Sequence, residues 1–351
     1  MKHVAQLDGL RAIAVTAVVL FHASSNSPIA GGFLGVDMFF VLSGFLITRI
    51  LAREYAATGT IALGQFYLRR LMRLMPALVL LLAFYLVFAP TIWPQYGSGP
   101  HLRDAAITAT YLSDYAYAGW SLPTYLRHTW SLSVEEHFYL IWPIVLPAVL
   151  GLRNPVRCMA ILFVAASAWR MAEFADLGWQ QAYYRFDTRL SGLVAGGWLA
   201  LAMGQNSAWQ FGRHLSPSVM TKAAVALIAS MFVLQQWRLS SAMYLTTPMV
   251  ELATAILINA VVASTTQPHA LAPRLSAWLG SAPLVWIGKL SYGIYLWHFP
   301  ISLLTRDQLP FWLSAAFCMA GGTAIAWISY QTVERFGRHW RSASQRGTAV
   351  A

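Results

Sequence analysis

The chain alternates between long apolar runs and short polar stretches, and ten apolar segments follow one another along it. A membrane span needs about 20 predominantly apolar residues. Several segments are shorter or more polar than that, which is typical of helices that line a protein-enclosed cavity instead of lipid. The pattern predicts an all-α integral membrane protein with about ten transmembrane helices that enclose a polar cavity. The segments centre on residues 8–26, 33–52, 74–93, 133–151, 156–174, 189–204, 220–237, 243–263, 284–304 and 311–333.

The composition favours the same class of protein. The 351 residues are 58% hydrophobic and 11% charged, whereas soluble domains carry about 25% charged residues. The formal net charge is +11, but most arginines lie in short loops beside apolar runs. Positive-inside topology and attraction to anionic lipid therefore explain the charge better than a nucleic-acid partner does.

The distribution of basic residues predicts the orientation. With ten spans both chain ends lie on one side, which collects fifteen Lys and Arg residues against seven on the other. The side with more basic residues is the cytoplasmic one. We therefore expect both termini in the cytoplasm, one transmembrane domain over residues 1–335, and a basic cytoplasmic tail over residues 336–351.

The first segment, RAIAVTAVVLFH, has an ionisable residue at each end of an apolar run. Arg11 and His22 are eleven residues apart, about three helical turns, so both project from one face of a helix. Asp8 lies three residues before Arg11 and can pair with it. Either Arg11 snorkels to the interface and His22 caps the outer end, or both residues line a functional site. In such a site His22 is suited to act as a general base.

Arginines gather where the third segment begins, in FYLRRLMRLMPAL. Arg70 and Arg73 share a face of a helix, and Arg69 is adjacent. Guanidinium groups bind phosphate in a bidentate manner. The cluster is therefore a candidate phosphate-binding site, and a topology signal is the alternative interpretation.

The fourth segment begins within HTWSLSVEEHFYLIWP, which holds two adjacent carboxylates, Glu135 and Glu136. They point about 100° apart, so at most one is expected to face a site. The other can simply complement the helix dipole. No metal is expected, because there is no H-E-x-x-H pattern and His128 and His137 are not at a helical ligand spacing.

Two later segments carry further ionisable residues. Asp187 and Arg189 are two residues apart and cannot face each other on one helix, so each is expected to contact another helix. Lys289 and His298 are nine residues apart, which places them half a turn out of phase and in different environments. His298 is read as structural or as part of a site.

Six stretches, in their order along the chain, strongly resemble the membrane acyltransferase-3 family of polytopic O-acyltransferases. They are LDGLRAIAVTAVVLFH, GGFLGVDMFFVLSGFLI, RRLMRLMPA, TWSLSVEEHFYLIWP, FDTRLSGLVAG and LSYGIYLWHFPI. The resemblance covers roughly residues 5–335. One departure is Ser191, which stands where the family often has an aspartate after the D-T-R triplet. Beyond the arginines and His22, the candidate site residues are Asp37, Trp130, Ser131, Glu135, Asp187, Arg189, Lys289, Tyr292 and His298.

The resemblance implies an activity. Members of that family move an acyl group, commonly acetyl, from acyl-CoA to a hydroxyl of a surface polysaccharide, a lipid-linked glycan or sometimes a macrolide. We therefore expect a stand-alone membrane O-acyltransferase of a bacterial-type inner membrane, with acyl-CoA as donor, a glycan as acceptor and no metal. O-acylation of a macrolide-type molecule and secondary transport are the alternatives. The acyl group, the acceptor and the oligomeric state stay open.

The family motifs also imply roles for individual residues. The R-x10-H motif falls on Arg11 and His22. His22 is expected to act as the general base or as a transient acyl acceptor, and Glu135 to orient its ring or share its proton. Arg11 is expected to anchor the donor or stabilise developing negative charge. The R-x-x-R motif falls on Arg70 and Arg73, so these two and the adjacent arginine are expected to bind the phosphates of CoA.

Overall fold

The structure is a computed structural model that describes residues 3–204, 216–265 and 271–332. Over these residues the chain is helical and contains no β-strand. Its α-helices are α1 (Ala5–His22), α2 (Gly35–Thr58), α3 (Leu63–Ile92), α4 (Ser98–Ala109), α5 (Ser113–Trp120), α6 (Trp130–Leu150), α7 (Pro155–Tyr184), α8 (Phe186–Gly204), α9 (Pro217–Leu234), α10 (Thr247–Ala263), α11 (Pro273–Leu279), α12 (Ala282–Thr305) and α13 (Phe311–Gln331). Shorter helical turns are η1 (Gly32–Leu34), η2 (Pro94–Tyr96), η3 (Arg127–Thr129) and the π-helical turn η4 (Ala242–Thr246).

Each of the ten predicted apolar segments coincides with a long helix. Seven helical stretches in the described part of the chain are long and apolar enough to cross a membrane, in agreement with a multi-pass membrane protein. They are α1, η1 with α2, α3, α7, α9, η4 with α10, and α13. The other three predicted segments correspond to α6, α8 and α12, which carry the carboxylates and the histidine named above.

The boundaries differ from the sequence prediction in two ways. Helix α3 begins at Leu63, so the arginine cluster lies within the helix and not at its entrance. Pro76 is therefore an interior residue of α3. Three shorter helices, α4, α5 and α11, occupy connections that carry no long apolar run.

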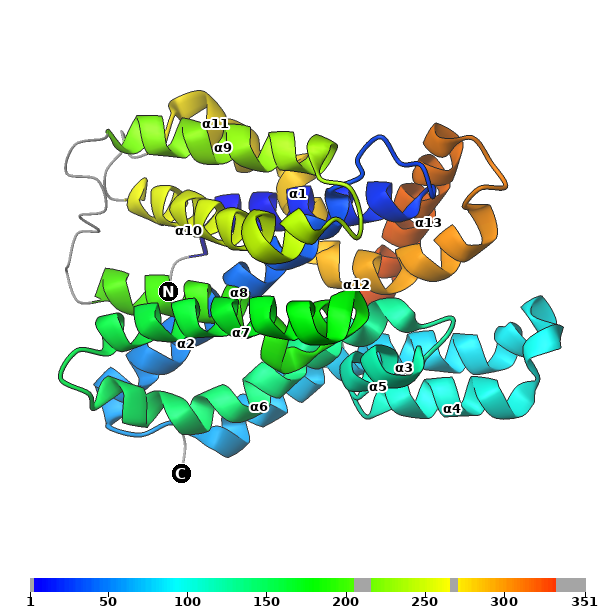
Figure 1. The fold of residues 1–351 in the computed structure, drawn as a ribbon, viewed down its shortest axis with the longest axis horizontal. Helices are drawn as coiled ribbons and strands as arrows, with labels where there is room; N and C mark the ends of the chain where they lie inside the picture. The colour runs from blue at the N-terminus through cyan, green and yellow to red at the C-terminus, as the bar shows by residue number, and fades with distance from the viewer. Residues whose placement is uncertain (1–2, 205–215, 266–270, 333–351) are drawn as a thin grey trace.

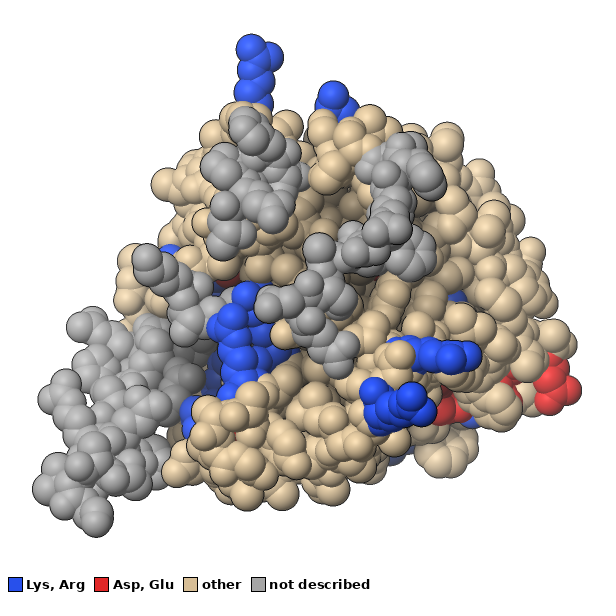
Figure 2. Space-filling view, turned by 90° about the vertical axis from the view of Figure 1, so that its left-hand side faces the viewer, with Lys and Arg blue, Asp and Glu red and all other residues tan. Residues whose placement is uncertain are grey.

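Figure 1 shows most of the long helices lying side by side along the longest axis of the molecule. Helix α1 begins at the left-hand end of this view, and α4 lies beside α3 at the right-hand end. The turns between α2 and α3 and between α6 and α7 also lie at the left-hand end, which we call the basic end. Figure 2 looks onto this end and shows Lys and Arg side chains gathered on it.

Glycines let two pairs of helices approach closely. A Cβ atom on Gly44 of α2 would collide with the backbone of Leu193 in α8. In the same way, a Cβ atom on Gly288 of α12 would collide with the backbone of Asp8 in α1. Small residues at such contacts are typical of helix packing in membranes. The second contact holds α1 against α12 and so determines which residues of α12 reach the end of α1.

Candidate active site

A cavity of about 690 Å³ lies where α1 and α12 end, away from the basic end. Its lining includes His22, the last residue of α1, together with Ser25 and Asn26 from the connection that follows. Arg306, which directly follows α12, also lines it. Its volume lies within the range of about 300–1,000 Å³ that is typical of small-molecule sites. We call it the outer cavity.

Two histidines from α1 and α12 meet at the outer cavity. The Nδ1 atom of His22 lies 3.1 Å from the Nε2 atom of His298. The Nδ1 atom of His298 lies 2.7 Å from the backbone oxygen of Tyr295. His298 is fully buried, whereas His22 is partly exposed and lines the cavity.

These contacts define where the hydrogens of the neutral rings lie. A carbonyl oxygen can only accept, so Nδ1 of His298 carries a hydrogen and donates it to Tyr295. Nε2 of His298 then has a lone pair and accepts from Nδ1–H of His22. Nε2 of His22 is left unprotonated, and it has no hydrogen-bond partner among the described residues. The arrangement therefore presents a base to the cavity.

His128 and Tyr295 hold the histidine pair in place. Nε2 of His128 donates to the backbone oxygen of Leu296 at 3.2 Å, and its ring stacks on Phe299 with 4.7 Å between centroids. The hydroxyl of Tyr295 donates to the backbone oxygen of His128 at 2.8 Å and lies 2.6 Å from Oγ of Ser131. These contacts fasten α12 to the start of α6.

A second, much smaller pocket of about 40 Å³ adjoins the outer cavity, because Val36 and Tyr295 line both. Arg11 lines this inner pocket, whereas His22 lines the outer cavity. The expectation that both residues project from one face of α1 is therefore confirmed. The other polar residues that line the inner pocket are Ser131, Glu135, Ser291 and Tyr292.

Two expected contacts of this site are wrong. Asp8 accepts a hydrogen bond from His3 at 2.6 Å rather than pairing with Arg11. Glu135 does not orient His22, because its position on α6 directs it to the inner pocket. Its oxygens accept from Ser43 at 2.7 Å and from Tyr139 at 3.2 Å.

A third cavity, of about 400 Å³, is lined by Arg70, Glu136 and Tyr139. We call it the arginine cavity. The guanidinium of Arg70 lies 3.6 Å from the centre of the Tyr139 ring, which is a cation–π contact. Leu74 also lines this cavity, and its backbone oxygen accepts from Tyr292 of the inner pocket at 3.1 Å. The three cavities therefore follow one another, and the two adjacent carboxylates of α6 face different ones.

The three arginines of α3 have different surroundings. Arg70 is partly buried against Tyr139. Arg73 is exposed, and its charge interacts with that of Arg11. Arg69 contacts Glu54 at 3.8 Å. Only Arg70 of the three lines the arginine cavity.

A buried network of charges lies directly behind the wall of the outer cavity, since the guanidinium of Arg189 lies 4.7 Å from the centre of the Tyr183 ring, which lines that cavity. Arg189 donates to Asp37 at 2.5 Å, and both side chains are almost fully buried. Arg170 donates to Ser191 at 2.5 Å, and Ser191 in turn donates to Glu251 at 2.7 Å. The network joins α2, α7, α8 and α10. Asp37 and Arg189 therefore hold helices together and do not line the three cavities.

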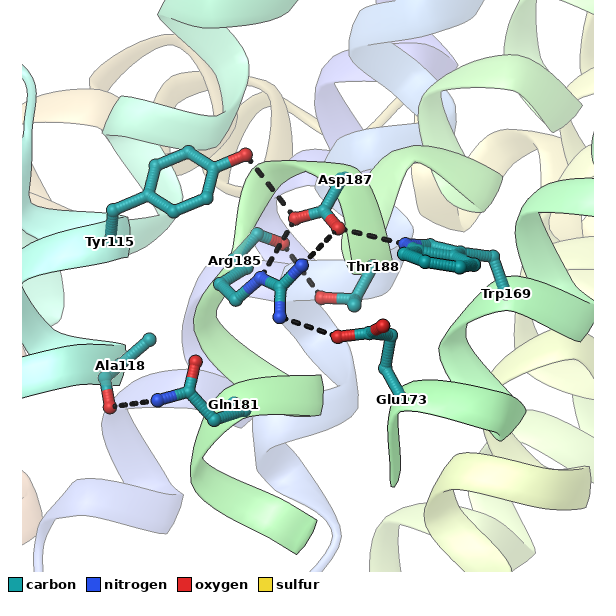
Figure 3. Close-up of polar contacts among 8 residues, drawn as sticks. All are labelled: Tyr115, Ala118, Trp169, Glu173, Gln181, Arg185, Asp187 and Thr188. Carbon is teal, nitrogen blue, oxygen red and sulfur yellow. Dashed lines mark hydrogen bonds and ion pairs between the residues drawn. The ribbon is translucent and has the colours of Figure 1, made fainter. Parts of the chain in front are cut away.

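Asp187 belongs to a different cluster, which Figure 3 shows. Its carboxylate accepts from Arg185 at 2.5 Å, from Trp169 at 2.8 Å and from Tyr115 at 3.2 Å. Arg185 also donates to Glu173 at 2.5 Å. The cluster joins α5, α7 and α8. The prediction that Asp187 and Arg189 contact different helices is confirmed.

The remaining candidate residues, Lys289, His298 and Trp130, lie in different surroundings. Lys289 is exposed and His298 is buried, as their opposite phases on α12 predict. Trp130 lines the outer cavity. Within the described ranges, no three His, Cys, Asp or Glu side chains gather as metal ligands.

The sequence reasoning missed several residues of the outer cavity. Tyr295 could have been found, because it lies three residues before His298 and shares its helix face. His128 lies in η3, just before α6, and its spacing from His137 marks it in the sequence only as an unsuitable metal ligand. Trp237 and Arg238 lie in the connection after α9, where no motif marks them.

A polytopic helical protein with a histidine pair at an internal cavity fits a membrane-embedded group-transfer enzyme, and sequence comparison identifies the family. The family described as "Acyltransferase domain" matches residues 4–331. The chain therefore belongs to the acyltransferase-3 family, as its motifs predicted.

Two relatives show how far the similarity extends. The peptidoglycan O-acetyltransferase OatA of Listeria monocytogenes is 35% identical over 357 residues, which cover 95% of this chain and 55% of that protein. The O-acetyltransferase OatA of Staphylococcus aureus is 31% identical over 364 residues, which cover 95% of this chain and 57% of that protein. The chain thus spans about half the length of these relatives. No solved structure matches it.

Proposed function

We propose that the protein is a membrane O-acetyltransferase that moves an acetyl group from acetyl-CoA to a hydroxyl of a cell-envelope glycan. The observation that carries the proposal is the histidine pair, which presents Nε2 of His22 to the outer cavity in a chain of the acyltransferase-3 family. Relatives named as peptidoglycan O-acetyltransferases support a glycan of the peptidoglycan type as the acceptor.

His22 acts as the general base in this reaction. Its Nε2 removes the proton from the acceptor hydroxyl while the hydroxyl oxygen attacks the thioester carbonyl. The resulting tetrahedral oxyanion collapses, the carbon–sulfur bond breaks, and the thiolate of CoA takes the proton from Nε2–H of His22. The products are the O-acetyl ester and CoA. His298 stays neutral, accepts from Nδ1–H of His22 and stabilises the imidazolium that forms.

The arginines give the donor a route from the basic end. Arg70 binds a phosphate group of acetyl-CoA at the arginine cavity, and Arg73, one turn further along α3, binds another phosphate group beside it, because guanidinium groups suit phosphate. Arg11 lies in the inner pocket, between the arginine cavity and His22 and about 16 Å along α1 from His22. This distance is too long for a contact with the oxyanion that forms beside His22, so the role of Arg11 is to anchor the donor on its way to the outer cavity. Donor and acceptor would then approach from opposite ends of the molecule.

This route requires a particular topology. We propose that α6, α8 and α12 also cross the membrane, which gives ten spans that enclose the cavities in a bacterial-type inner membrane. Their ionisable residues are buried or half-buried against protein, except Lys289 near the start of α12, which is exposed. Contact with protein is how ionisable residues are accommodated inside membranes. Both termini then lie in the cytoplasm at the basic end. The predicted basic tail, 336–351, lies outside the described residues.

Transfer by the purified protein tests the proposal. The protein is reconstituted into liposomes with acetyl-CoA labelled in the acetyl group and an oligosaccharide of N-acetylglucosamine and N-acetylmuramic acid. We expect labelled O-acetyl ester with the wild type, none with His22→Ala, and wild-type yield with the control variant His3→Ala, which replaces an exposed histidine. Equal transfer by His22→Ala contradicts the role of His22, and no transfer by the wild type contradicts the function.

The same material separates the alternatives. If His22 carries the acetyl group, mass spectrometry of protein quenched without acceptor finds an acetylated His22, whereas a general base leaves the ring unmodified. Uptake of labelled saccharide into liposomes without acetyl-CoA would instead indicate a transporter.

A further inference from the structure

The outer cavity is lined by positive charge without a carboxylate. Three arginines, Arg127, Arg238 and Arg306, line it, and within the described residues no aspartate or glutamate does. These residues come from separate parts of the chain: before α6, after α9 and after α12. The reaction proposed above uses none of them. A cavity lined in this way favours an anionic ligand.

Two of these arginines have no ion-pair partner among the described residues. Arg127 lies over the ring of Phe299, with 5.2 Å between its guanidinium and the ring centre. Arg238 has a positive backbone φ of 67°, a conformation that is uncommon for residues other than glycine. Such conformations persist where the surrounding structure fixes them, and they cluster at ligand sites.

The third arginine is partly compensated. Arg306 donates to Oγ of Ser25 at 3.1 and 2.8 Å, and it lies 3.5 Å from the neighbouring carboxylate of Asp307. Asp307 also accepts from the backbone N–H of Ser25 at 2.9 Å. These contacts tie the connection after α1 to the connection after α12 at the mouth of the cavity. The uncompensated charge therefore comes from Arg127 and Arg238.

Aromatic rings form the rest of the wall. Trp237, which precedes Arg238, packs against Phe21, Phe33 and Tyr183 with 5.3, 4.9 and 4.7 Å between ring centroids. These contacts hold the segment that carries Arg238. Aromatic rings present flat apolar faces beside polar groups, and they are common in pockets that fix the orientation of a ligand.

We propose that the outer cavity selects acceptors that carry an anionic group, a carboxylate or a phosphate, and that Arg238 and Arg127 bind this group. The proposal rests on the proposed function and adds the charge of its acceptor. The anion belongs to the acceptor and not to CoA, because the cavity lies at the end of α1 farthest from the basic end. Guanidinium groups bind both carboxylates and phosphates in a bidentate manner.

Three acceptors that differ in their anionic group test this proposal in liposomes. The first is an oligosaccharide of N-acetylglucosamine and N-acetylmuramic acid with a free carboxylate, the second is its methyl ester, and the third is the methyl ester with a phosphate on its reducing end. A charge-assisted hydrogen bond corresponds to about a 10- to 150-fold difference in affinity. We therefore expect a KM at least about tenfold lower for one anionic acceptor than for the ester, and the acceptor preferred identifies the group.

Variants then assign the preference to the arginines. Arg238→Gln is expected to raise the KM for the anionic acceptor about tenfold and to leave the KM for the ester and for acetyl-CoA unchanged. Arg238→Lys is expected to restore part of the preference. Arg127→Gln is the second variant, for use if Arg238→Gln is not monodisperse in detergent. The matched control is Arg103→Gln, because Arg103 lies on α4 outside the cavity.

The outcomes separate the two proposals. Equal KM values for all three acceptors overturn the charge preference and leave the acetyltransferase function standing. A rise in the KM for acetyl-CoA in Arg238→Gln also overturns it, because Arg238 would then bind the donor. If the wild type transfers acetyl to none of the acceptors, the proposed function fails and the preference fails with it.

Discussion

Replacement of His298 by leucine tests the chemistry of the histidine pair. His298 is fully buried and accepts from Nδ1–H of His22 at 3.1 Å. Leucine fills the space but cannot accept this hydrogen bond. The imidazolium of His22 then loses its partner in the transition state, and its ring is free to adopt the other tautomer.

The size of the effect follows from this contact. A hydrogen bond to a charged group contributes about 1.5–3 kcal/mol, which corresponds to about a 10- to 150-fold change in rate. Loss of the orienting carboxylate in a serine protease triad costs about 10⁴-fold. His298 is neutral where that group is charged, so we expect kcat of His298→Leu to fall about 10- to 150-fold. His298→Gln should lose less, because its amide oxygen can still accept.

The assay is steady-state acetyl transfer in liposomes with acetyl-CoA and acceptor varied separately. Because His298 acts through His22, kcat is expected to fall with little change in either KM. The double variant of His298→Leu with His22→Ala should be no slower than His22→Ala alone, because residues that act as a unit are not additive. A kcat of His298→Leu within about twofold of the wild type refutes this reasoning.

Three further predictions concern stability, packing and topology. Arg189→Leu should destabilise the protein by about 3–5 kcal/mol because it leaves Asp37 buried and unpaired, and replacement of both residues by leucine should restore most of the melting temperature measured in detergent. Gly288→Leu should push α12 away from α1 and reduce kcat without a selective change in either KM, because its side chain would meet backbone. In a variant without the native cysteines, a cysteine at Asn26 should react with an impermeant maleimide in intact cells and one at Thr60 only after lysis, whereas the reverse pattern contradicts the orientation.

The apolar runs in the sequence predicted the long helices well, because each long helix contains one such run. It predicted their ends less well. The first turns of α3, which carry the arginines, are too polar to be recognised as part of an apolar segment, although they continue the helix from Leu63. Helices α4 and α5 lie in a polar connection, and packing against α3, α6 and α7 stabilises them more than their own pattern does.

Helical phase also predicted part of the site. Arg11 and His22 could be placed on one face because spacing within a helix determines direction. The contact between His22 and His298 could not be read in this way, since it depends on the close approach of α1 and α12 at Gly288. The same limit explains why the contacts of Glu135 were not predicted. Its place in a motif beside Glu136 does not show which helix its side chain faces.

Ser191 shows how one unusual position fits its surroundings. The family motif often has an aspartate here, and this chain has a serine that accepts from Arg170 and donates to Glu251. Asp37 and Glu251 balance Arg189 and Arg170 in this buried network. A third carboxylate would leave a buried negative charge without a partner, which is costly in a low-dielectric interior. A hydroxyl transmits the contact without adding charge, so in this chain Glu251 supplies the carboxylate that an aspartate at this position would bring.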